Sequence, residues 1–211
     1  MSESRRVPIA ILLSGRGTNM VSLVRAAGDG RLHADVRVVV SNKADAGGLL
    51  LAAELGIPTL VLNHRDFPTR EAFDSALADA LDQRGVEFVA LAGFMRVLTP
   101  TFLNRFPRRV INIHPALLPS FPGIHAQAQA LGYGARITGC TVHFVDEGTD
   151  TGPVIAQVAV QIRDEDDEDT LSARILQQEN LLYPQALDDV LCGRLRFEGR
   201  RVLRAREATG C

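Results

Sequence analysis

The sequence contains little cysteine, no surplus of positive charge and no hydrophobic run of membrane-spanning length. Its three cysteines, Cys140, Cys192 and Cys211, are widely spaced and form no CxxC pair. They therefore indicate neither a disulfide framework nor a zinc site, and we expect a cytoplasmic protein in a reducing compartment. The first apolar segment, Val7–Leu13, is interrupted by Pro8 and is typical of a strand rather than of a signal peptide.

The charge balance argues against a protein that binds nucleic acid through electrostatics. Lys and Arg number 23 and Asp and Glu number 25, which gives a formal net charge of -2. A nucleic-acid binder usually carries a basic surplus or stripe, so we expect small-molecule partners and neither nucleic acid nor a membrane. With 211 residues, 46% of them hydrophobic, the chain can bury one sizeable core. We expect a single domain with a core at about residues 7–200 and a loose C-terminal tail, as a monomer or homodimer.

Strand-like and helical patterns alternate through the first half of the chain, without repeats or low-complexity linkers. This alternation predicts an α/β fold with a doubly wound, Rossmann-like, mostly parallel sheet. Two longer apolar runs follow and are expected to pair as antiparallel C-terminal strands. The expected strands lie at 7–13, 36–40, 58–62, 86–92, 110–113, 136–145 and 154–162, with a possible final strand at 195–203, and the expected helices begin near 18, 45, 70, 100 and 170.

Residues 117–134 break the alternation because they are punctuated by proline and glycine. We expect an irregular loop here, and a loop of this length inside a compact domain more often belongs to a site than to a connector.

A glycine loop, Ser-Gly-Arg-Gly-Thr-Asn at residues 14–19, follows the first strand and precedes a helical stripe. Its glycines let backbone N–H groups approach an anion, and Thr18 or Asn19 is expected to cap a helix whose positive end faces the same point. Position 20 is Met, so the motif is not a full G-x-G-x-x-G, and no Walker lysine follows. The residues alone leave open a phosphate site and a tight turn with ordinary capping, and they favour the turn.

Two charged features also have alternative explanations. Arg70 lies in the first turn of a helix that follows Thr69, where the helix dipole favours acids, so it either faces an anionic ligand or is solvated. Residues 164–169 are six consecutive acids. They are expected to form a solvated loop that supplies negative charge to the helix beginning near Thr170, with metal binding as a minor alternative.

The strongest chemical signal is at residues 110–119. Strand periodicity places Asn112 and His114 on the same face, and Pro115 ends the strand, so both side chains are expected at its C-terminal rim, where open α/β sheets bind ligands. The later loop 145–153 can bring the Asp150 carboxylate towards His114. An amide, an imidazole and a carboxylate suffice for proton transfer around a developing oxyanion. Alternatively, the histidine is a satisfied turn residue and the asparagine caps backbone.

Several motifs occur together in the order of one enzyme family. They are Ser-Gly-Arg-Gly-Thr-Asn at 14–19, Ser-Asn-Lys-Ala-Asp-Ala at 41–46, Leu-Ala-Gly-Phe-Met-Arg at 91–96, Asn-Ile-His-Pro-Ala-Leu-Leu-Pro at 112–119 and Asp-Thr-Gly-Pro-Val at 150–154. Over about residues 7–200 the chain closely resembles the phosphoribosylglycinamide formyltransferases of purine biosynthesis. The Asn-x-His-Pro core and the loop around Asp150 mark the wider family that uses formyltetrahydrofolate.

The resemblance implies a role for each matched position. Catalysis would fall to Asn112, His114 and Asp150. The ribonucleotide would be bound by Gly17, Thr18, Asn19, Gln177, Gln178 and Glu179. The folate would be bound by Arg70, Met95, Arg96, Val97, Leu98, Asn112, Asp146, Glu147, Gly148, Thr149 and Asp150.

The resemblance also implies the reaction. The amine of glycinamide ribonucleotide would attack the formyl carbon of the co-substrate 10-formyltetrahydrofolate, without a metal. Asn112 would donate a hydrogen bond to the developing oxyanion, and His114, its charged form favoured by Asp150, would shuttle protons. The chain departs mildly from the family pattern at Arg16, Thr18 and Gln127, which bear on affinity and loop ordering.

His143 lies on a strand face towards the site and is expected at most to contact the site residues, whereas Cys140 is expected to be a small packed residue.

Three other functions are alternatives to the transferase. A formyltetrahydrofolate hydrolase would use the same three catalytic residues with water, but it usually adds an N-terminal domain, and only six residues precede the first strand. A methionyl-tRNA formyltransferase should carry a basic C-terminal domain. A nucleotide-binding module would bind ligand without turnover.

Overall fold

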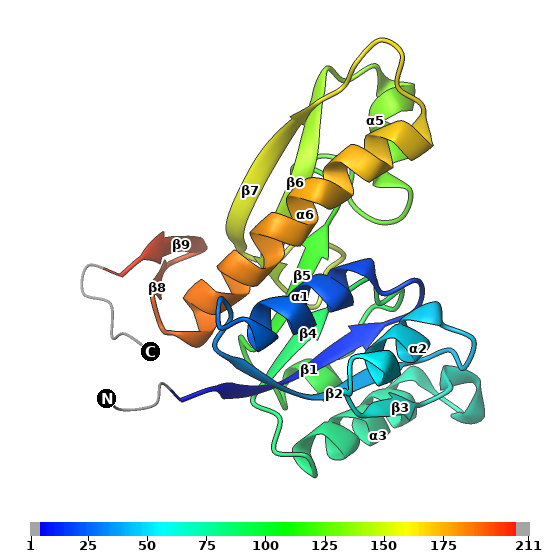
Figure 1. The fold of residues 1–211 in the computed structure, drawn as a ribbon, viewed down its shortest axis with the longest axis vertical. Coiled ribbons are helices and arrows are strands. Elements are labelled where there is room, and N and C mark those ends of the chain that lie inside the picture. Colours follow the sequence, from blue (N-terminus) through cyan, green and yellow to red (C-terminus); the bar gives the residue numbers. More distant parts are fainter. Residues whose placement is uncertain (1–4, 206–211) are drawn as a thin grey trace.

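A computed structural model describes residues 5–205 and shows a seven-stranded sheet with helices on both faces (Figure 1). The strand order is β3-β2-β1-β4-β5-β6-β7. The pairs among the first five strands are parallel, and β6 and β7 join as antiparallel strands. The predicted fold class, a mostly parallel sheet with antiparallel C-terminal strands, is therefore confirmed.

The elements have the following bounds. The strands are β1 Val7–Leu13, β2 Ala34–Ser41, β3 Thr59–Val61, β4 Phe88–Leu91, β5 Val110–His114, β6 Ile137–Phe144, β7 Val154–Gln161, β8 Leu195–Glu198 and β9 Arg201–Arg204. The helices are α1 Thr18–Gly28, α2 Gly47–Glu54, the 3-10 turn η1 His64–Asp66, α3 Arg70–Asp82, α4 Pro100–Leu103, α5 Ala126–Tyr133 and α6 Glu168–Leu191. Among the described residues, no helix combines the length and the apolarity that crossing a membrane requires.

The central strands are apolar on both faces because each face is covered by helices. In β1, Ile9 and Ile11 pack into a core that includes residues of α1 and α6, whereas Ala10 and Leu12 pack into a core that includes residues of α3 and α4. This alternation follows from the two-residue period of a strand, and it explains why the run is almost continuously apolar. The two cores hold the carboxyl ends of β1, β4 and β5 side by side, and the loops that follow these strands form one rim.

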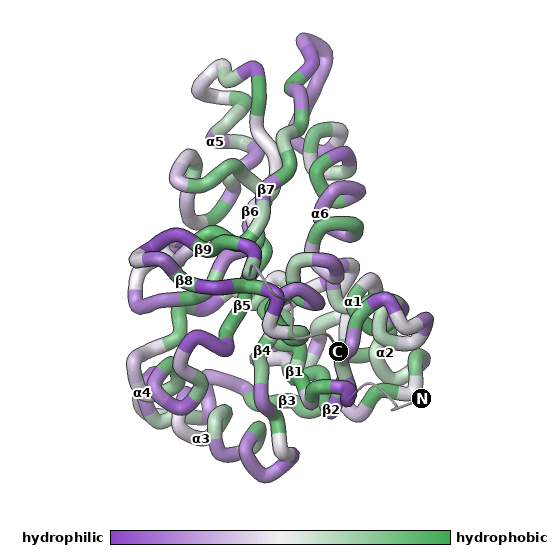
Figure 2. The backbone as a smooth tube through the Cα atoms, turned by 90° about the vertical axis from the view of Figure 1, so that its left-hand side faces the viewer, coloured by the Kyte–Doolittle hydropathy of each residue, from purple (hydrophilic) through white to green (hydrophobic). Residues whose placement is uncertain are grey.

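A second part of the molecule projects from this body (Figures 1 and 2). We call it the wing; it consists of α5, β6, β7 and the first half of α6. A third core, with Cys140, Val160 and Ile175 among its buried residues, holds it together. In Figure 2 the strands are mainly hydrophobic, and the turn between β7 and α6 at the tip of the wing is hydrophilic.

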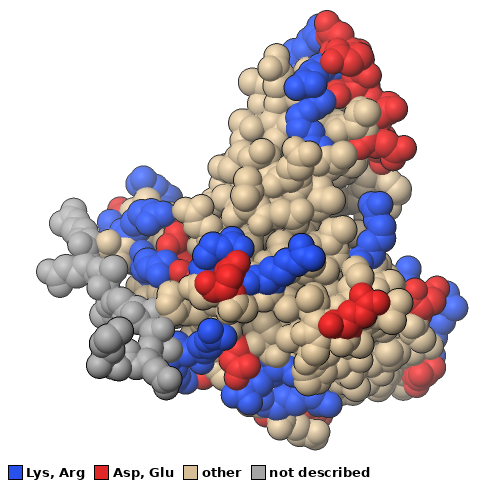
Figure 3. All heavy atoms as spheres, viewed as in Figure 1, with Lys and Arg blue, Asp and Glu red and all other residues tan. Residues whose placement is uncertain are grey.

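The acidic run lies at the tip of the wing beside basic side chains (Figure 3). Asp164 pairs with Arg136 and Asp166 pairs with Arg174, and this guanidinium lowers the pKa of Asp166. Asp167 caps α6 by accepting a hydrogen bond from Thr170 N at 2.8 Å. The run therefore supplies negative charge to the start of a helix, as expected, but α6 begins at Glu168 rather than near Thr170, and several of the carboxylates are engaged in pairs or in the cap.

Tyr183 fastens α6 to the sheet. Its buried hydroxyl lies 3.0 Å from the carbonyl oxygen of Leu91 in β4 and 2.9 Å from that of Ile111 in β5. The next residue, Pro184, is accommodated inside the helix, which continues to Leu191. The long helix thus crosses the strands that carry the candidate site.

We expect Tyr183→Phe to lower the free energy of unfolding by about 1 to 2 kcal/mol, because it removes a buried hydrogen bond while keeping the ring. Urea denaturation measures the change. Tyr133→Phe is the matched control, since Tyr133 is 82% exposed. Equal stability of the two variants would contradict this role of the Tyr183 hydroxyl.

The sequence-based expectations fail at two elements. The expected irregular loop 117–134 contains the helix α5, whose internal glycine, Gly132, is tolerated inside it. The expected strand 195–203 is instead two short strands, β8 and β9, which turn at Gly199 with φ +61° and form a separate sheet. The predicted loose tail includes residues 206–211, which lie outside the described residues.

Two of the cysteines lie within the described residues. Cys140 is a free buried thiol, as expected for a packed residue, and burial raises its pKa to about 12. Cys192 is disulfide-bonded, which the spacing of the cysteines did not predict.

Candidate active site

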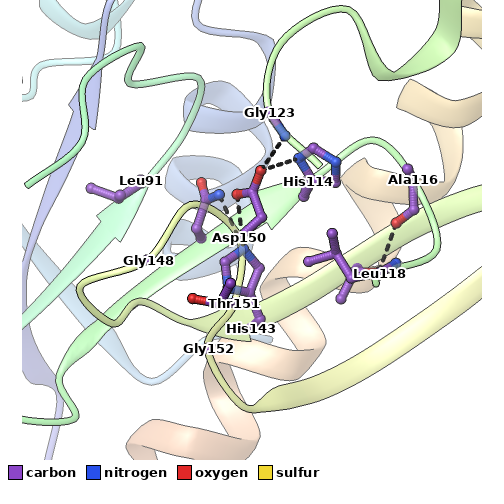
Figure 4. Close-up of polar contacts among 12 residues, drawn as sticks. Leu91, His114, Ala116, Leu118, Gly123, His143, Gly148, Asp150, Thr151 and Gly152 are labelled. Atoms are coloured by element: carbon purple, nitrogen blue, oxygen red, sulfur yellow. Dashed lines mark hydrogen bonds and ion pairs between the residues drawn. The ribbon is translucent and has the colours of Figure 1, made fainter. Parts of the chain in front are cut away.

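The side chains of His114, Asp150 and His143 meet at the end of β5 (Figure 4). The ring of His114 is almost fully buried, and its Nδ1 lies 3.3 Å from Oδ2 of Asp150. Its other nitrogen, Nε2, lies 2.8 Å from the carbonyl oxygen of Phe121. Asn112, two residues earlier on the same strand, presents its amide to His143, with Nδ2 to Nε2 at 3.2 Å. The predicted convergence of an amide, an imidazole and a carboxylate is therefore present.

Asp150 reaches this point because its loop turns back sharply after β6. Its backbone is left-handed, with φ 54°, a conformation that non-glycine residues adopt at a cost and that often accompanies function. Its carboxylate accepts a hydrogen bond from Gly123 N at 2.8 Å, so the loop after β5 holds it from the opposite side. At Gly152 a side chain would collide with the carbonyl of Phe144, so the return of the chain requires glycine there.

The hairpin of β8 and β9 contacts the loop that carries Asp150. Arg200, at the turn of the hairpin, donates hydrogen bonds to the carbonyl oxygens of Thr151 and Gly152. This contact was not predicted from the sequence, because it joins residues 48 or 49 positions apart.

The loop that follows His114 is anchored by two side chains of the wing. Thr141, opposite His114 in the strand register, donates to Ala116 O at 2.7 Å and accepts from Leu118 N at 3.1 Å. Gln157 donates to Leu118 O at 2.9 Å. Sequence reasoning assigned no role to these two residues, and no local signal distinguishes them from ordinary strand residues.

The glycine loop differs from the expectation in its capping. Helix α1 begins after Gly17, with φ 79°, and no side chain caps it, so neither Thr18 nor Asn19 is the cap. The physical reason is that Asn19 instead donates from Nδ2 to Oε2 of Glu179, at 2.9 Å. A side chain at Gly17 would place its Cβ 2.6 Å from Gly48 Cα, so the loop packs backbone to backbone against the start of α2.

Glu179 lies in the middle of α6 and faces the glycine loop. It is almost fully buried, and burial raises the pKa of its carboxyl group, while the hydrogen bond from Asn19 opposes this shift. Of its neighbours, Gln177 is exposed and Gln178 is half-buried. The structure therefore brings Glu179 to the glycine loop and turns Gln177 to solvent.

Residues 95–98, expected to line a folate pocket, follow β4 on the same rim. Met95 is 69% exposed and Val97 45%, whereas Leu98 is buried. The half-buried Arg96 lies with its guanidinium 4.9 Å from the ring centre of Phe73. Arg70 donates from Nη2 to Val97 O at 2.8 Å, so it lies beside this segment.

Ser14 connects the glycine loop with the segment after β4. Its backbone N–H donates to Gly93 O at 3.0 Å, and its hydroxyl accepts from Met95 N at 2.9 Å. The same hydroxyl donates to Oδ1 of the buried Asn42 at 2.6 Å. Both residues belong to the motifs noted above, yet their spacing alone did not indicate this link.

The remaining expected folate residues are in the loop before Asp150. Asp146 is half-buried and accepts hydrogen bonds from Gly148 N at 3.2 Å and from the hydroxyl of Thr151 at 2.6 Å. Glu147, Gly148 and Thr149 are exposed. The exposed part of the loop is therefore available to a ligand, while Asp146 maintains its shape.

Among the described residues, one group has the spacing of a metal site: His33, Asp188 and Cys192. It lies away from the rim, since His33 precedes β2 at the amino end of the sheet. Asp188 is paired with His33 at 2.9 Å and with Arg194 at 2.9 Å, and Cys192 is disulfide-bonded. These interactions account for the cluster without an ion.

Known proteins match nearly the whole chain. A family model described as formyl transferase matches residues 7–187. Phosphoribosylglycinamide formyltransferase of Escherichia coli (strain K12) is 42% identical over 189 residues, which is 90% of this chain and 89% of that protein. Trifunctional purine biosynthetic protein adenosine-3 of Drosophila melanogaster is 48% identical over 89% of this chain, and the match spans 14% of that protein.

Solved structures are similar to this chain over nearly its whole length. Glycinamide ribonucleotide transformylase 1 from Symbiobacterium toebii superposes with a TM-score of 0.94 at 44% identity, covering 96% of this chain and 95% of that chain. Phosphoribosylglycinamide formyltransferase from Brucella melitensis has a TM-score of 0.85 at 43% identity, covering 92% of this chain and 100% of that chain. The chain therefore belongs to the formyl transferase family, among the phosphoribosylglycinamide formyltransferases.

Proposed function

We propose that this chain transfers the formyl group of 10-formyltetrahydrofolate to the amine of glycinamide ribonucleotide, which gives N-formylglycinamide ribonucleotide in purine biosynthesis. The observation that carries the proposal is the buried pair of His114 and Asp150, 3.3 Å apart, at the strand end that also presents Asn112. The folate serves as co-substrate, and the proposed formyl transfer requires no metal.

The reaction transfers one carbon between two nitrogens. The lone pair of the glycinamide amine attacks the formyl carbon, and the carbonyl oxygen gains a negative charge that Asn112 stabilises by donating from Nδ2. The amine loses a proton, and the bond from the formyl carbon to N10 of the folate breaks as N10 gains a proton. His114 carries protons between these positions, and Asp150 stabilises its charged form.

The hydrogen-bond partners of His114 support this role. Carbonyl and carboxylate oxygens accept, and both ring nitrogens face such oxygens, from Phe121 and Asp150. A ring protonated on both nitrogens satisfies both partners, and such an imidazolium can deliver a proton. We propose that the substrate replaces the Phe121 carbonyl as the acceptor of the Nε2 proton.

The two substrates approach from neighbouring strand ends. The glycine loop at Gly17, Thr18 and Asn19 receives the ribonucleotide phosphate, and Glu179 receives the ribose side, with Gln177 and Gln178 nearby on α6. The folate lies along residues 95–98 and the loop 146–150, with Arg70 towards its acidic end. Because β1, β4 and β5 are adjacent, the two substrates are held close together, which supplies the entropic part of catalysis.

We also propose where the reaction takes place and in what form the chain acts. We place the reaction in the cytoplasm, carried out by a single domain spanning about residues 7–200 as a monomer or homodimer. Gel filtration with light scattering and fluorescence microscopy of the tagged protein test these predictions.

The direct test follows formyl-group loss from 10-formyl-dideazafolate by absorbance, with and without glycinamide ribonucleotide. We expect loss only when the amine substrate is present, together with recovery of the formylated product. Equal loss without the amine would indicate a hydrolase. Ligand binding without any loss would indicate a nucleotide-binding module and overturn the proposal.

A further inference from the structure

We propose that His143 is a positioning residue that fixes the orientation of the Asn112 carboxamide for formyl transfer. The inference rests on the transferase function proposed above. It starts from the place of His143 in the fold: its side chain is 2% exposed, on β6, directly opposite Asn112 in the strand register. Figure 4 shows its ring beneath Asp150.

The contacts of the ring determine which nitrogen carries the proton. Nδ1 lies 2.9 Å from the carbonyl oxygen of Phe144, which can only accept, so Nδ1 is the donor. Burial lowers the pKa of His143, although the bond to Phe144 and the charge of Asp150 oppose the shift. A neutral ring with its proton on Nδ1 has a lone pair on Nε2.

That lone pair determines how the Asn112 amide is turned. Nε2 lies 3.2 Å from Nδ2 of Asn112, so the NH2 group, rather than the amide oxygen, must face His143. One N–H is then used by His143, and the second N–H of the same nitrogen is left to donate to the formyl oxygen. If the amide turned over, its oxygen would face the developing negative charge, and the stabilisation would become repulsion.

The charges around His143 explain why its neutral state matters. Asp150 Oδ1 lies 3.6 Å from Nε2, and His114 and Asp146 are the other titratable groups that influence the ring. A protonated His143 would donate to Asp150 and present an N–H to the amide of Asn112. It would thereby share the single charge of the carboxylate with His114, through the other oxygen, and release the amide. The buried, neutral ring avoids both effects.

Two substitutions distinguish the roles of the two ring nitrogens, because each variant can keep the hydrogen bond of only one nitrogen. In His143→Gln the side-chain oxygen can take the place of Nε2 and accept from Asn112, whereas in His143→Asn the amide can retain only the bond made by Nδ1. We expect His143→Gln to retain most of kcat. We expect His143→Asn to lose about 10-fold to 100-fold in kcat, which is no more than the smallest effect of removing an oxyanion donor outright, with both KM values nearly unchanged. Equal losses in the two variants would mean a merely structural role and would overturn the inference.

A second measurement does not depend on activity. Long-range 1H–15N NMR of the wild-type protein reports the protonation of each imidazole nitrogen. We expect His143 to be neutral with its proton on Nδ1 at neutral pH, because burial lowers its pKa and the Phe144 carbonyl accepts from Nδ1. A proton on Nε2, or a charged ring at neutral pH, would overturn the inference and leave the proposed transfer reaction untouched. Absence of transferase activity with the expected tautomer would overturn the proposed function instead.

Discussion

Asp150→Asn is expected to abolish most formyl transfer while the protein stays folded. The substitution keeps the size of the side chain and removes its charge. Asn tolerates the left-handed backbone at this position, and its amide oxygen can still accept from Gly123 N. What is lost is the negative charge 3.3 Å from Nδ1 of His114, on which the proposed proton transfer depends.

The expected loss in kcat is about 10³-fold to 10⁴-fold, the size found when an amide replaces the carboxylate that supports a catalytic histidine. Single-turnover formyl transfer from 10-formyl-dideazafolate measures it, and circular dichroism checks the fold. Asp164→Asn is the matched control, because Asp164 is 84% exposed at the tip of the wing. Turnover close to that of the wild type in Asp150→Asn would remove the assigned role.

Gly17→Ala is expected to raise the KM for glycinamide ribonucleotide strongly and to leave the KM for the folate nearly unchanged. An alanine at φ +79° costs roughly 1 to 2 kcal/mol. Its Cβ would also lie 2.6 Å from Gly48 Cα, so the loop must move away from α2. If the displacement removes two charge-assisted hydrogen bonds to the phosphate, at about 1.5 kcal/mol each, the KM rises about 100-fold.

Gly15→Ala is the control within the same loop. A Cβ at Gly15 meets no atom within 4 Å, and the residue is not in the left-handed region. Steady-state kinetics with each substrate varied in turn distinguish the two variants. A similar KM for the ribonucleotide in both would show that the phosphate does not bind at this loop.

Much of the fold could be predicted because it depends on periodicity within single elements. The apolar run of β1 and the stripe of α1 follow from burial on one or two faces, which each segment encodes in its own spacing. The common face of Asn112 and His114 also follows from the two-residue period, and Pro115 marks where the strand stops. The motifs indicate the family from the sequence alone.

Three sequence-based predictions are wrong, and each of them rests on a local residue pattern. The cap of α1 was assigned to Thr18 or Asn19 because such residues commonly cap helices, but the side chain of Asn19 is used by Glu179, 160 positions away. The sequence does not indicate α5, because Pro119, Pro122 and Gly123 before it and glycines at its end are typical of a loop. The sequence predicts one strand where the hairpin of β8 and β9 lies, because the turn of the hairpin contains a single glycine, Gly199.

Residue spacing is enough to predict the alternating strands and helices of the first half of the chain, the shared face of Asn112 and His114, and the family. The partners of these residues become known only from the folded chain: Phe121 and Gly123 lie around His114 and Asp150, Arg200 lies behind the loop of Asp150, and His143 lies opposite Asn112. The physical reason is that a periodic pattern records whether a residue is buried. Which atom it meets there depends on strand register and on the paths of loops that are distant in sequence.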